Sequence, residues 1–422
     1  MTKYKAYPSY KDSGVEWLGD VPSEWDILYG KNLFSTERNQ SLKKDEQLAV
    51  TQKYGVIPQT LFMKLENQKV VLALKGTSGF RRVKKNDYVI SLRSFQGGIE
   101  YSIYDGCVSP AYTVLRNKSE IDFNYYARLF KCAPYITALQ SSTDSLREGK
   151  SITFEQFGSI YIPLPPLTEQ KAIADFLDKA TAKIDTTIEK QTKLIELLKE
   201  KRQAVISHAV TKGLDPNAPM KEYRLDWVCE VVRGNSAFKK DELLESGKYV
   251  ALQYGKTYKI EQVDNSFNFY VNEEFYKPGQ IVEYGDTILI STSETIKDLG
   301  HSCFYARNDI GLIGGEQILL KPINNIIFDK FLYYSSRVFC PLLSRYSTGL
   351  KVFRFSTDDL KYIFISIPNI NEQKQIADYL DKKTAQIDTL VDKAKQSIEL
   401  LKEKRTALIS AAVTGKIDVR GA

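Results

Sequence analysis

The chain has 422 residues, of which 43% are hydrophobic, so it has room for two or three domains with ordinary cores. No apolar stretch approaches the roughly 18 residues of a membrane-spanning helix, and the first residues carry no hydrophobic signal region, so we expect a cytoplasmic protein that meets no membrane. Five scattered cysteines and two histidines exclude the usual zinc-binding spacings, and a net charge of +7 is too modest to indicate a nucleic-acid binder by itself.

Residues 1–162 are predicted to form a mixed α/β module with an N-terminal arm. Tyr, Phe and β-branched residues alternate with turn signals, and short strands are expected at residues 69–74, 88–92 and 112–115. Cations, glycines and hydroxyl side chains gather after the first of these strands, and a second polar stretch follows the strand at 88–92.

Cations and hydroxyl side chains can meet phosphate oxygens, and Arg and Gln can read base edges. The side chains of this module that we expect to contact nucleic acid are Lys75, Thr77, Ser78, Arg81, Arg82, Arg93, Ser94, Gln96 and Lys150. The alternative explanation for residues 75–85 is an ordinary solvated hairpin tip.

Residues 163–216 are predicted to form a long helix. Apolar side chains recur at steps typical of a coiled-coil seam, at Ile173, Leu177, Ile184, Leu194 and Leu198. Thr168 is the expected N-cap, Pro165 lies just upstream, and Gly213 is a stop signal near the end. About 43 helical residues at 1.5 Å each would give a rod of about 65 Å.

Residues 217–366 are predicted to form a second mixed α/β module, with strands at residues 249–253, 287–290 and 317–320. It resembles the first only weakly: Trp25-Asp26 opens one module and Asp226-Trp227 the other. Its expected nucleic-acid contacts are Lys239, Lys240, Tyr254, Lys256, Tyr258, Ser291, Ser293, Lys351 and Arg354. Each is a weak signal alone, because basic loops are common.

Residues 367–422 repeat the long helix. Residues 363–418 align with residues 160–215 without a gap, and the run from Ile195 to Arg202 recurs unchanged from Ile398 to Arg405. Asn371 is the expected N-cap, and the seam returns at Ile376, Leu380, Ile387, Leu401 and Leu408. A lone rod with one apolar stripe is unstable in water, so we expect the two rods to pack together. The alternative is that each rod packs on its own module.

No catalytic constellation is evident. The sequence Gly149-Lys150-Ser151 resembles the end of a phosphate loop, but Asp144 stands where such a loop needs glycine. There is no Gly-x-Gly-x-x-Gly motif and no Asn-Pro-Pro-aromatic tetrapeptide of amino-methyltransferases; Ser109-Pro110-Ala111-Tyr112 comes nearest and lacks the amide. We therefore expect a chain that is not an enzyme, with no metal and no cofactor of its own.

The chain resembles the specificity subunit of type I restriction–modification enzymes. The resemblance rests on Pro163-Leu164-Pro165-Pro166-Leu167-Thr168-Glu169-Gln170, on the segment from Ile367-Pro368 to Glu372-Gln373, and on the opening Tyr10-Lys11-Asp12-Ser13-Gly14-Val15-Glu16-Trp17-Leu18-Gly19. It covers essentially the whole chain. The second copy departs from the Pro-Leu-Pro-Pro run and reads Ser366-Ile367-Pro368-Asn369, although one proline remains at the helix entrance.

The resemblance implies an α+β fold in which two target-recognition domains are joined by two long antiparallel coiled-coil helices, with a pseudo-twofold internal repeat. It implies that each domain reads one half of a split double-stranded DNA target, and that the helices set the gap and dock two methyltransferase subunits. Restriction subunits that translocate DNA would join them, and S-adenosylmethionine, ATP and magnesium are expected on those partners. Inserting a few residues within 181–193 should then lengthen the gap without altering either half.

Three other hypotheses remain open at this point. One is the same architecture in a related multi-subunit restriction system. A second is an enzyme whose site has not been recognised, which would methylate or cut DNA without partners. A third is a structural two-headed coiled-coil scaffold, which would bind duplexes without sequence preference.

Overall fold

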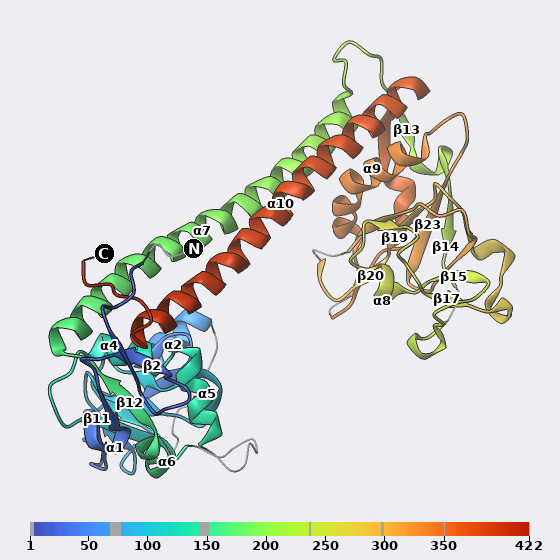
Figure 1. Ribbon diagram of the computed structural model, residues 1–422. Coiled ribbons are helices and arrows are strands. Elements are labelled where there is room, and N and C mark those ends of the chain that lie inside the picture. Colours follow the sequence, from blue (N-terminus) through green and yellow to red (C-terminus); the bar gives the residue numbers. More distant parts are fainter. Residues whose placement is uncertain are drawn as a thin grey trace. The chain divides into compact units, whose positions relative to one another are not determined.

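The computed structural model describes residues 4–67, 77–142, 152–235, 238–296, 299–349 and 351–421. The strand expected at residues 69–74, together with Lys75 and Lys150, lies outside the described residues. The chain forms two compact units: unit 1 comprises Met1–Gln191 and Gln396–Ala422, and unit 2 comprises Thr192–Lys395. Each long helix therefore contributes one segment to each unit (Figure 1).

The first module, in unit 1, is built on a four-stranded antiparallel sheet. Its strand order is β4 (Phe34–Glu37), β11 (Thr113–Asn117), β8 (Tyr88–Ile90) and β9 (Glu100–Tyr101). Four two-stranded antiparallel ribbons accompany it: β1 (Tyr10–Asp12) with β2 (Asp20–Pro22), β3 (Asp26–Tyr29) with β12 (Tyr161–Leu164), β5 (Leu48–Thr51) with β6 (Gly55–Pro58), and β7 (Arg81–Val83) with β10 (Gly106–Val108). The strands expected near residues 88–92 and 112–115 are confirmed as β8 and β11.

Short helices cover this sheet and supply an aromatic core. They are α1 (Gly30–Leu33), α2 (Gln59–Glu66), α3 (Ser94–Gly97), α4 (Phe123–Leu129), α5 (Ala133–Ser141) and α6 (Phe154–Ser159). Phe34 of β4, Tyr88 of β8, Tyr126 of α4 and Phe157 of α6 are all fully buried in one cluster. Large apolar rings of this kind dominate the energetics of a core because each removes so much surface from water.

The second module, in unit 2, has two mixed sheets. One has the order β14 (Cys229–Arg233), β23 (Gln317–Pro322), β19 (Thr287–Ile290), β21 (Ser302–Tyr305), β16 (Gln262–Val263), and the other β17 (Tyr270–Val271), β15 (Tyr249–Leu252), β22 (Gly311–Ile313), β18 (Ile281–Val282). The pairs β16–β21 and β15–β22 are parallel and the others antiparallel. The strands expected at 249–253, 287–290 and 317–320 are confirmed. The two modules therefore differ in sheet topology, as their weak sequence likeness predicts.

The remaining elements of unit 2 connect these sheets to the long helices. They are β13 (Lys221–Arg224) paired with β25 (Phe364–Ile367), β20 (Thr292–Ser293) paired with β24 (Phe353–Arg354), and the helices α8 (Tyr254–Thr257) and α9 (Asp329–Phe339). Phe331 and Leu332 of α9 are fully buried in one cluster with Ile206 of the first long helix and Ile376 of the second. The second module thus shares its core with both long helices.

The long helices are α7 (Leu167–Lys212, 46 residues) and α10 (Ile370–Val413, 44 residues). Both begin earlier than expected, so Thr168 and Asn371 are not their N-caps. The side-chain oxygen of Asn369 instead accepts the backbone N–H of Glu372 at 3.0 Å and that of Asn371 at 3.1 Å. Gly213 and Gly415 follow the helix ends with positive φ angles of 75° and 73°, the conformation that glycine adopts most readily. No helix within the described ranges is long and apolar enough to cross a bilayer.

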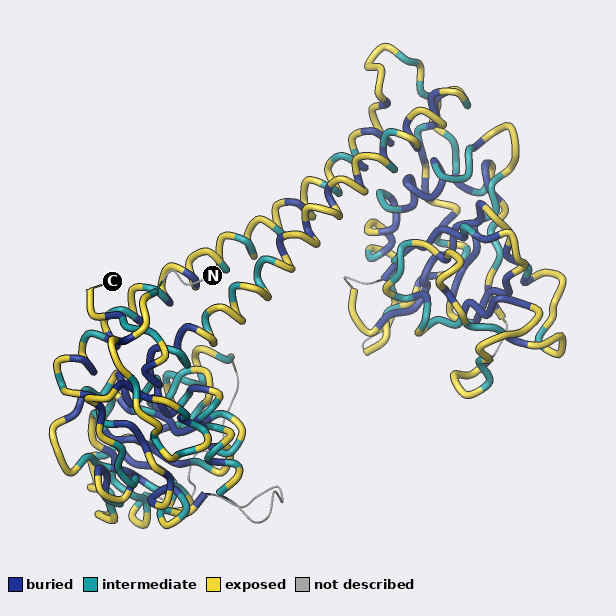
Figure 2. Tube along the Cα trace, in the orientation of Figure 1, coloured by how far each residue is buried: buried dark blue, intermediate teal, exposed yellow. Residues whose placement is uncertain are grey.

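In each unit a segment of α7 lies beside a segment of α10 and the two run in opposite directions (Figure 1). Buried positions recur along both helices with exposed positions between them (Figure 2). The predicted seam residues that are buried are Ile173, Leu177, Ile184, Leu198, Ile376, Leu380, Ile387 and Leu408, and Leu401 is half-buried. Leu194 differs, because 43% of it is exposed; Ile195, one position on, packs against Leu198 and Ile387 instead.

Candidate nucleic-acid surfaces and the helical frame

The described part of the basic stretch in the first module begins as a tight turn. Phe80 donates its backbone N–H to the carbonyl of Thr77 at 2.9 Å, and Ser78 is exposed within this turn. Ser41 holds the turn from the side, because its backbone N–H donates to Phe80 at 2.9 Å and its hydroxyl donates to Thr77. The turn is therefore anchored to a second loop that lies far away in sequence.

That second loop brings further cations beside the edge strand β7. Arg81 and Arg82 are half-buried, and Arg82 Nε lies 3.6 Å from Asp45 Oδ2. Lys43 and Lys44, immediately before Asp45, are exposed. Their sequence signal is only a pair of lysines, and it is the packing of this loop against β7 that adds them to the basic surface.

The polar stretch after β8 folds into the single turn α3. Arg93 and Gln96 are exposed there and free to face a ligand. Ser94 is not, because it is only 1% exposed and its hydroxyl accepts the backbone N–H of Ser91 at 2.8 Å. The expected contact at Ser94 is therefore corrected: this serine shapes the turn that carries Arg93 and Gln96.

In the second module, α8 carries an aromatic and cationic cluster. The rings of Tyr254 and Tyr258 lie 5.5 Å apart between centroids, and Lys256 Nζ lies 4.2 Å from the centroid of the Phe269 ring. All three predicted side chains are half-buried. Partly exposed tyrosines beside a lysine can combine stacking with attraction to phosphate.

A short loop, residues 314–317, connects α8 to the ribbon of β20 and β24. Gln317 Nε2 donates to Thr257 Oγ1 of α8 at 2.5 Å. The backbone carbonyl of Glu316 accepts the backbone N–H of Ser291 at 3.1 Å, and its Oε1 lies 3.6 Å from Arg354 Nη2. These buried bonds therefore connect α8 to the segment that faces β24.

A hollow of about 450 Å³ lies beside β20 and β24. The charged and hydroxyl side chains that line it are Arg233, Ser291, Thr292, Glu316, Tyr346, Thr348, Arg354, Ser356, Thr357 and Asp359. Arg354 is 63% exposed at its side chain, and Lys351 is exposed nearby in sequence. Ser293 is buried and its Oγ accepts the backbone N–H of Thr295 at 3.1 Å, so this expected contact is corrected, whereas Ser291 is mostly buried but lines the hollow and stays a predicted contact. Arg233 was not predicted from the sequence.

Lys239 and Lys240 lie elsewhere on the second module. Both are exposed at the turn η2 (Lys240–Glu242), where Glu242 accepts the backbone N–H of Lys239. Phe238 anchors this turn in a small cluster with Tyr249. The turn is rigidly attached, and its two ammonium groups face solvent.

The helical frame is held by two equivalent ion pairs. Within unit 2, Arg202 Nε of α7 lies 3.0 Å from Asp388 Oδ1 of α10. Within unit 1, Arg405 Nε of α10 lies 2.9 Å from Asp185 Oδ1 of α7. Arg202 and Arg405 are repeat equivalents, as are Asp185 and Asp388, so both units have the same register between the paired helices.

Each module is joined to its following helix by the repeated glutamine. Gln170 Oε1 accepts the backbone N–H of Asp122 at 2.8 Å, and its Nε2 donates to the carbonyl of Pro165 at 2.8 Å. Gln373 Oε1 accepts the backbone N–H of Phe328 at 2.7 Å, and its Nε2 donates to the carbonyl of Pro368 at 3.0 Å. Both amides are 1% exposed. One side chain in each copy therefore ties module, helix entrance and helix together.

Comparison with known proteins identifies this arrangement. The family described as type I restriction modification DNA specificity domain matches the chain twice, at residues 22–198 and 217–400. The chain belongs to this family. The type I restriction enzyme MjaVIII specificity subunit of Methanocaldococcus jannaschii is 25% identical over 383 residues, which cover 85% of this chain and 83% of the relative.

Solved structures of the family share the fold. A chain solved in a study of complex assembly and conformational transition of the type I R-M system superposes with a TM-score of 0.73, at 17% identity, covering 93% of this chain and 98% of the other. The HsdS subunit from Thermoanaerobacter tengcongensis gives a TM-score of 0.59, at 17% identity, covering 94% of this chain and 98% of that subunit. The α+β architecture with paired antiparallel long helices is thus that of type I specificity subunits.

The cysteines of this type I family member are buried structural residues. Burial raises the pKa of Cys132, Cys229 and Cys303 to about 12 in each case, so these thiols stay protonated at neutral pH. Over the described ranges, no group of three or more His, Cys, Asp or Glu side chains is placed to hold a metal ion.

Proposed function

We propose that this chain is the DNA-specificity subunit of a type I restriction–modification complex, and that each module reads one half of a bipartite double-stranded DNA target. Functionally we divide it into a first recognition domain at residues 1–162, a central helix at 163–216, a second recognition domain at 217–366 and a C-terminal helix at 367–422. The observation that carries the proposal is the contrast between a repeated frame and unlike modules. The paired helices carry the same ion pair in each unit, whereas the two modules have different sheet topologies. Two different modules are what the recognition of two different half-sites requires.

The proposed DNA contacts are the exposed and half-buried cationic, hydroxyl, tyrosine and amide side chains described above. In the first domain these are Thr77, Ser78, Arg81, Arg82, Arg93 and Gln96, joined by Lys43 and Lys44. In the second they are Lys239, Lys240, Tyr254, Lys256, Tyr258, Lys351 and Arg354, joined by Arg233 and by the mostly buried Ser291 of the hollow. Lysines would neutralise phosphates without reading sequence, whereas Arg93, Gln96 and Arg354 can form bidentate bonds to base edges.

The long helices would have two tasks. Because each runs from one unit into the other, they would set the number of base pairs between the half-sites. Because the frame is repeated, they would offer two equivalent docking sites to two methyltransferase subunits, which restriction subunits would join. S-adenosylmethionine, ATP and magnesium would then be bound by those partners, and this chain would recognise DNA in the cytoplasm without catalysing a reaction.

The test is to co-express the chain with its methyltransferase subunits and to map methylated adenines across the host genome. We expect one bipartite motif with a fixed gap. Replacing Arg354 should relax bases in one half, and replacing Arg93 should relax bases in the other. Methylation or cleavage by the purified chain alone, or methylation without a bipartite motif, would refute the proposal.

A further inference from the structure

One carboxylate ties the second module to both paired helices. Glu261, just before β16, pairs through Oε2 with Arg202 of α7 and through Oε1 with Arg337 Nη2 of α9 at 2.9 Å. Arg202 in turn pairs with Asp388 of α10 at 3.0 Å. These four side chains are here called the Glu261 clamp. Their ion pairs connect the residue that precedes β16 to helix α9 and to both long helices.

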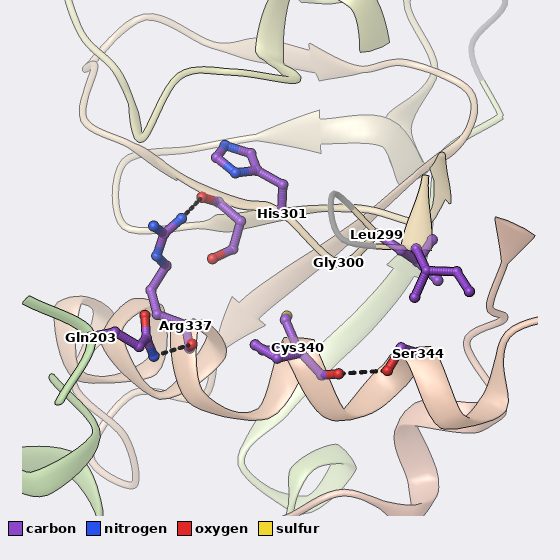
Figure 3. Close-up of a pocket in the computed structure, with 10 residues that line it drawn as sticks. Gln203, Leu299, Gly300, His301, Arg337, Cys340 and Ser344 are labelled. Atoms are coloured by element: carbon purple, nitrogen blue, oxygen red, sulfur yellow. Dashed lines mark hydrogen bonds between the residues drawn. The ribbon is translucent and has the colours of Figure 1, made fainter. Parts of the chain in front are cut away.

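Two cavities lie beside the clamp. On one side lies a cavity of about 400 Å³ lined by residues that include Gln203, His301 and Arg337 (Figure 3). On the other side lies a cavity of about 470 Å³, lined by residues that include Arg202, Glu261, Arg337 and Asp388. One helical turn further along α7, Ile206 joins the buried core of the module, so these polar bridges add direction to the apolar packing that attaches the module to α7.

The arginines of the clamp are shielded, which strengthens it. The side chain of Arg202 is 14% exposed and that of Arg337 is 18% exposed, whereas the side chain of Glu261 is 43% exposed. Gln203 Nε2 donates to the carbonyl of Arg337 at 3.0 Å, and Arg337 Nη1 donates to the carbonyl of Ser302 at 3.5 Å (Figure 3). Shared charge-assisted bonds on planar guanidinium groups restrict direction as well as distance.

Unit 1 has the same frame without the clamp. Arg405, the repeat equivalent of Arg202, pairs with Asp185 and forms no ion pair with the described residues of the first module. Lys131 of the first module pairs with Glu100, and both line a cavity of about 630 Å³ together with Arg405. The chain therefore contains its own comparison, a helix pair with the bridge and one without it.

We infer that Glu261 is a positioning residue that holds the second module in one orientation on the helices and thereby narrows the spacer lengths that the protein accepts. The inference rests on the proposed function. One added base pair moves a half-site by about 3.4 Å and rotates it by about a tenth of a helical turn. A clamped module must be strained to follow this movement, whereas an unclamped one can pivot to meet it.

The experiment uses the full chain in complex with its methyltransferase subunits and duplexes that carry the mapped half-sites. Each duplex has the natural spacer or a spacer one base pair longer or shorter, and Kd is measured for each. For Glu261→Gln we expect the ratio of Kd between altered and natural spacers to fall by about threefold, as suits a half-exposed ion pair. Base preference within each half should not change.

Three matched variants separate positioning from stability. Arg202→Gln should reproduce the fall in the ratio, whereas Arg405→Gln, which breaks the equivalent helix pair, should keep the wild-type ratio. Glu273→Gln removes an exposed ion pair with Lys248 on the same module and should also keep it. Thermal unfolding of all variants shows whether they are folded.

The outcomes distinguish a failure of the inference about Glu261 from a failure of the proposed function. If Glu261→Gln weakens binding equally for every spacer, or leaves the ratio at its wild-type value, the inference is overturned and the proposed function stands. If the wild-type complex itself binds every spacer equally, the proposed function fails and the inference falls with it.

Discussion

Replacing the repeated glutamine should loosen one unit at a time. Gln170→Ala removes the partners of two backbone groups, the half-buried N–H of Asp122 and the buried carbonyl of Pro165. A buried polar group left without a partner costs about 1–3 kcal/mol, so the attachment of the first module should lose about 2–4 kcal/mol after partial access of water. Gln373→Ala should do the same to Phe328 in unit 2.

Amide hydrogen exchange measures this loss at the atoms concerned. If the amide of Asp122 exchanges by local opening, a loss of about 2 kcal/mol should accelerate its exchange about 30-fold in Gln170→Ala. The amide of Phe328 should keep its wild-type rate in that variant, and Gln373→Ala should show the reverse. Unchanged exchange at Asp122, or equal acceleration at both amides in either variant, would refute the reasoning.

Three further predictions concern the seam, the recognition surface and a buried acid. Leu198→Ala should lower the free energy of unfolding by about 2–3 kcal/mol in thermal unfolding, whereas Leu194→Ala should change it by no more than about 0.5 kcal/mol because that side chain is half-exposed. Arg354→Ala should weaken competition binding to one half-site by about 1–3 kcal/mol, and Arg93→Ala to the other; equal losses on unrelated sequences would indicate phosphate contacts alone. Burial raises the pKa of Asp286 from 3.8 to about 6, so the folded chain keeps a proton that the unfolded chain has released, and stability falls as pH rises through this window. Asp286→Asn should remove up to about 3 kcal/mol of this dependence between pH 4 and 6.5 in denaturant unfolding, and an unchanged slope would contradict it.

The long helices were predictable from sequence because their signals are local and repeated. The seam spacing, the flanking prolines and the terminal glycines all agree with the observed helices. The errors are of one residue or two: Asn369 rather than Asn371 caps α10, and Ile195 rather than Leu194 faces the partner helix. Spacing alone does not distinguish neighbouring apolar positions where a helix leaves a strict seven-residue repeat.

The candidate DNA surfaces were less predictable because exposure is a tertiary property. A serine in a polar stretch has the same local signal whether it faces solvent or caps a turn, and Ser94 and Ser293 do the second. Conversely, Arg233 reaches the hollow beside Arg354 only because β14 and β24 are brought together by the fold of the second module. Sequence patterns identified the residue types but not the surfaces that they share.

The repeat also fails at one informative position. Glu169 accepts the hydroxyl of Tyr7 at 2.5 Å and the indole N–H of Trp25 at 3.0 Å, whereas its equivalent Glu372 has a buried Oε1 with no hydrogen-bond partner in the described part of the chain. The difference comes from the N-terminal arm, which packs on the end of α10: Lys416 Nζ donates to the carbonyl of Leu18 at 2.7 Å.

In unit 2 the corresponding end of α7 continues covalently into β13 and the second module. In unit 1 the end of the long helix is therefore attached to the module by non-covalent contacts of the arm and the C-terminal tail. In unit 2 the end of the long helix is attached to the module by the polypeptide chain itself. Arg420 Cζ lies 4.9 Å from the centroid of the Tyr7 ring, and the backbones of Lys5 and Asp418 pair as an antiparallel β-bridge, so the arm and the tail stabilise each other. Since these contacts are confined to unit 1, losing the arm should open the first module's attachment to α10 and leave the second module's clamp intact.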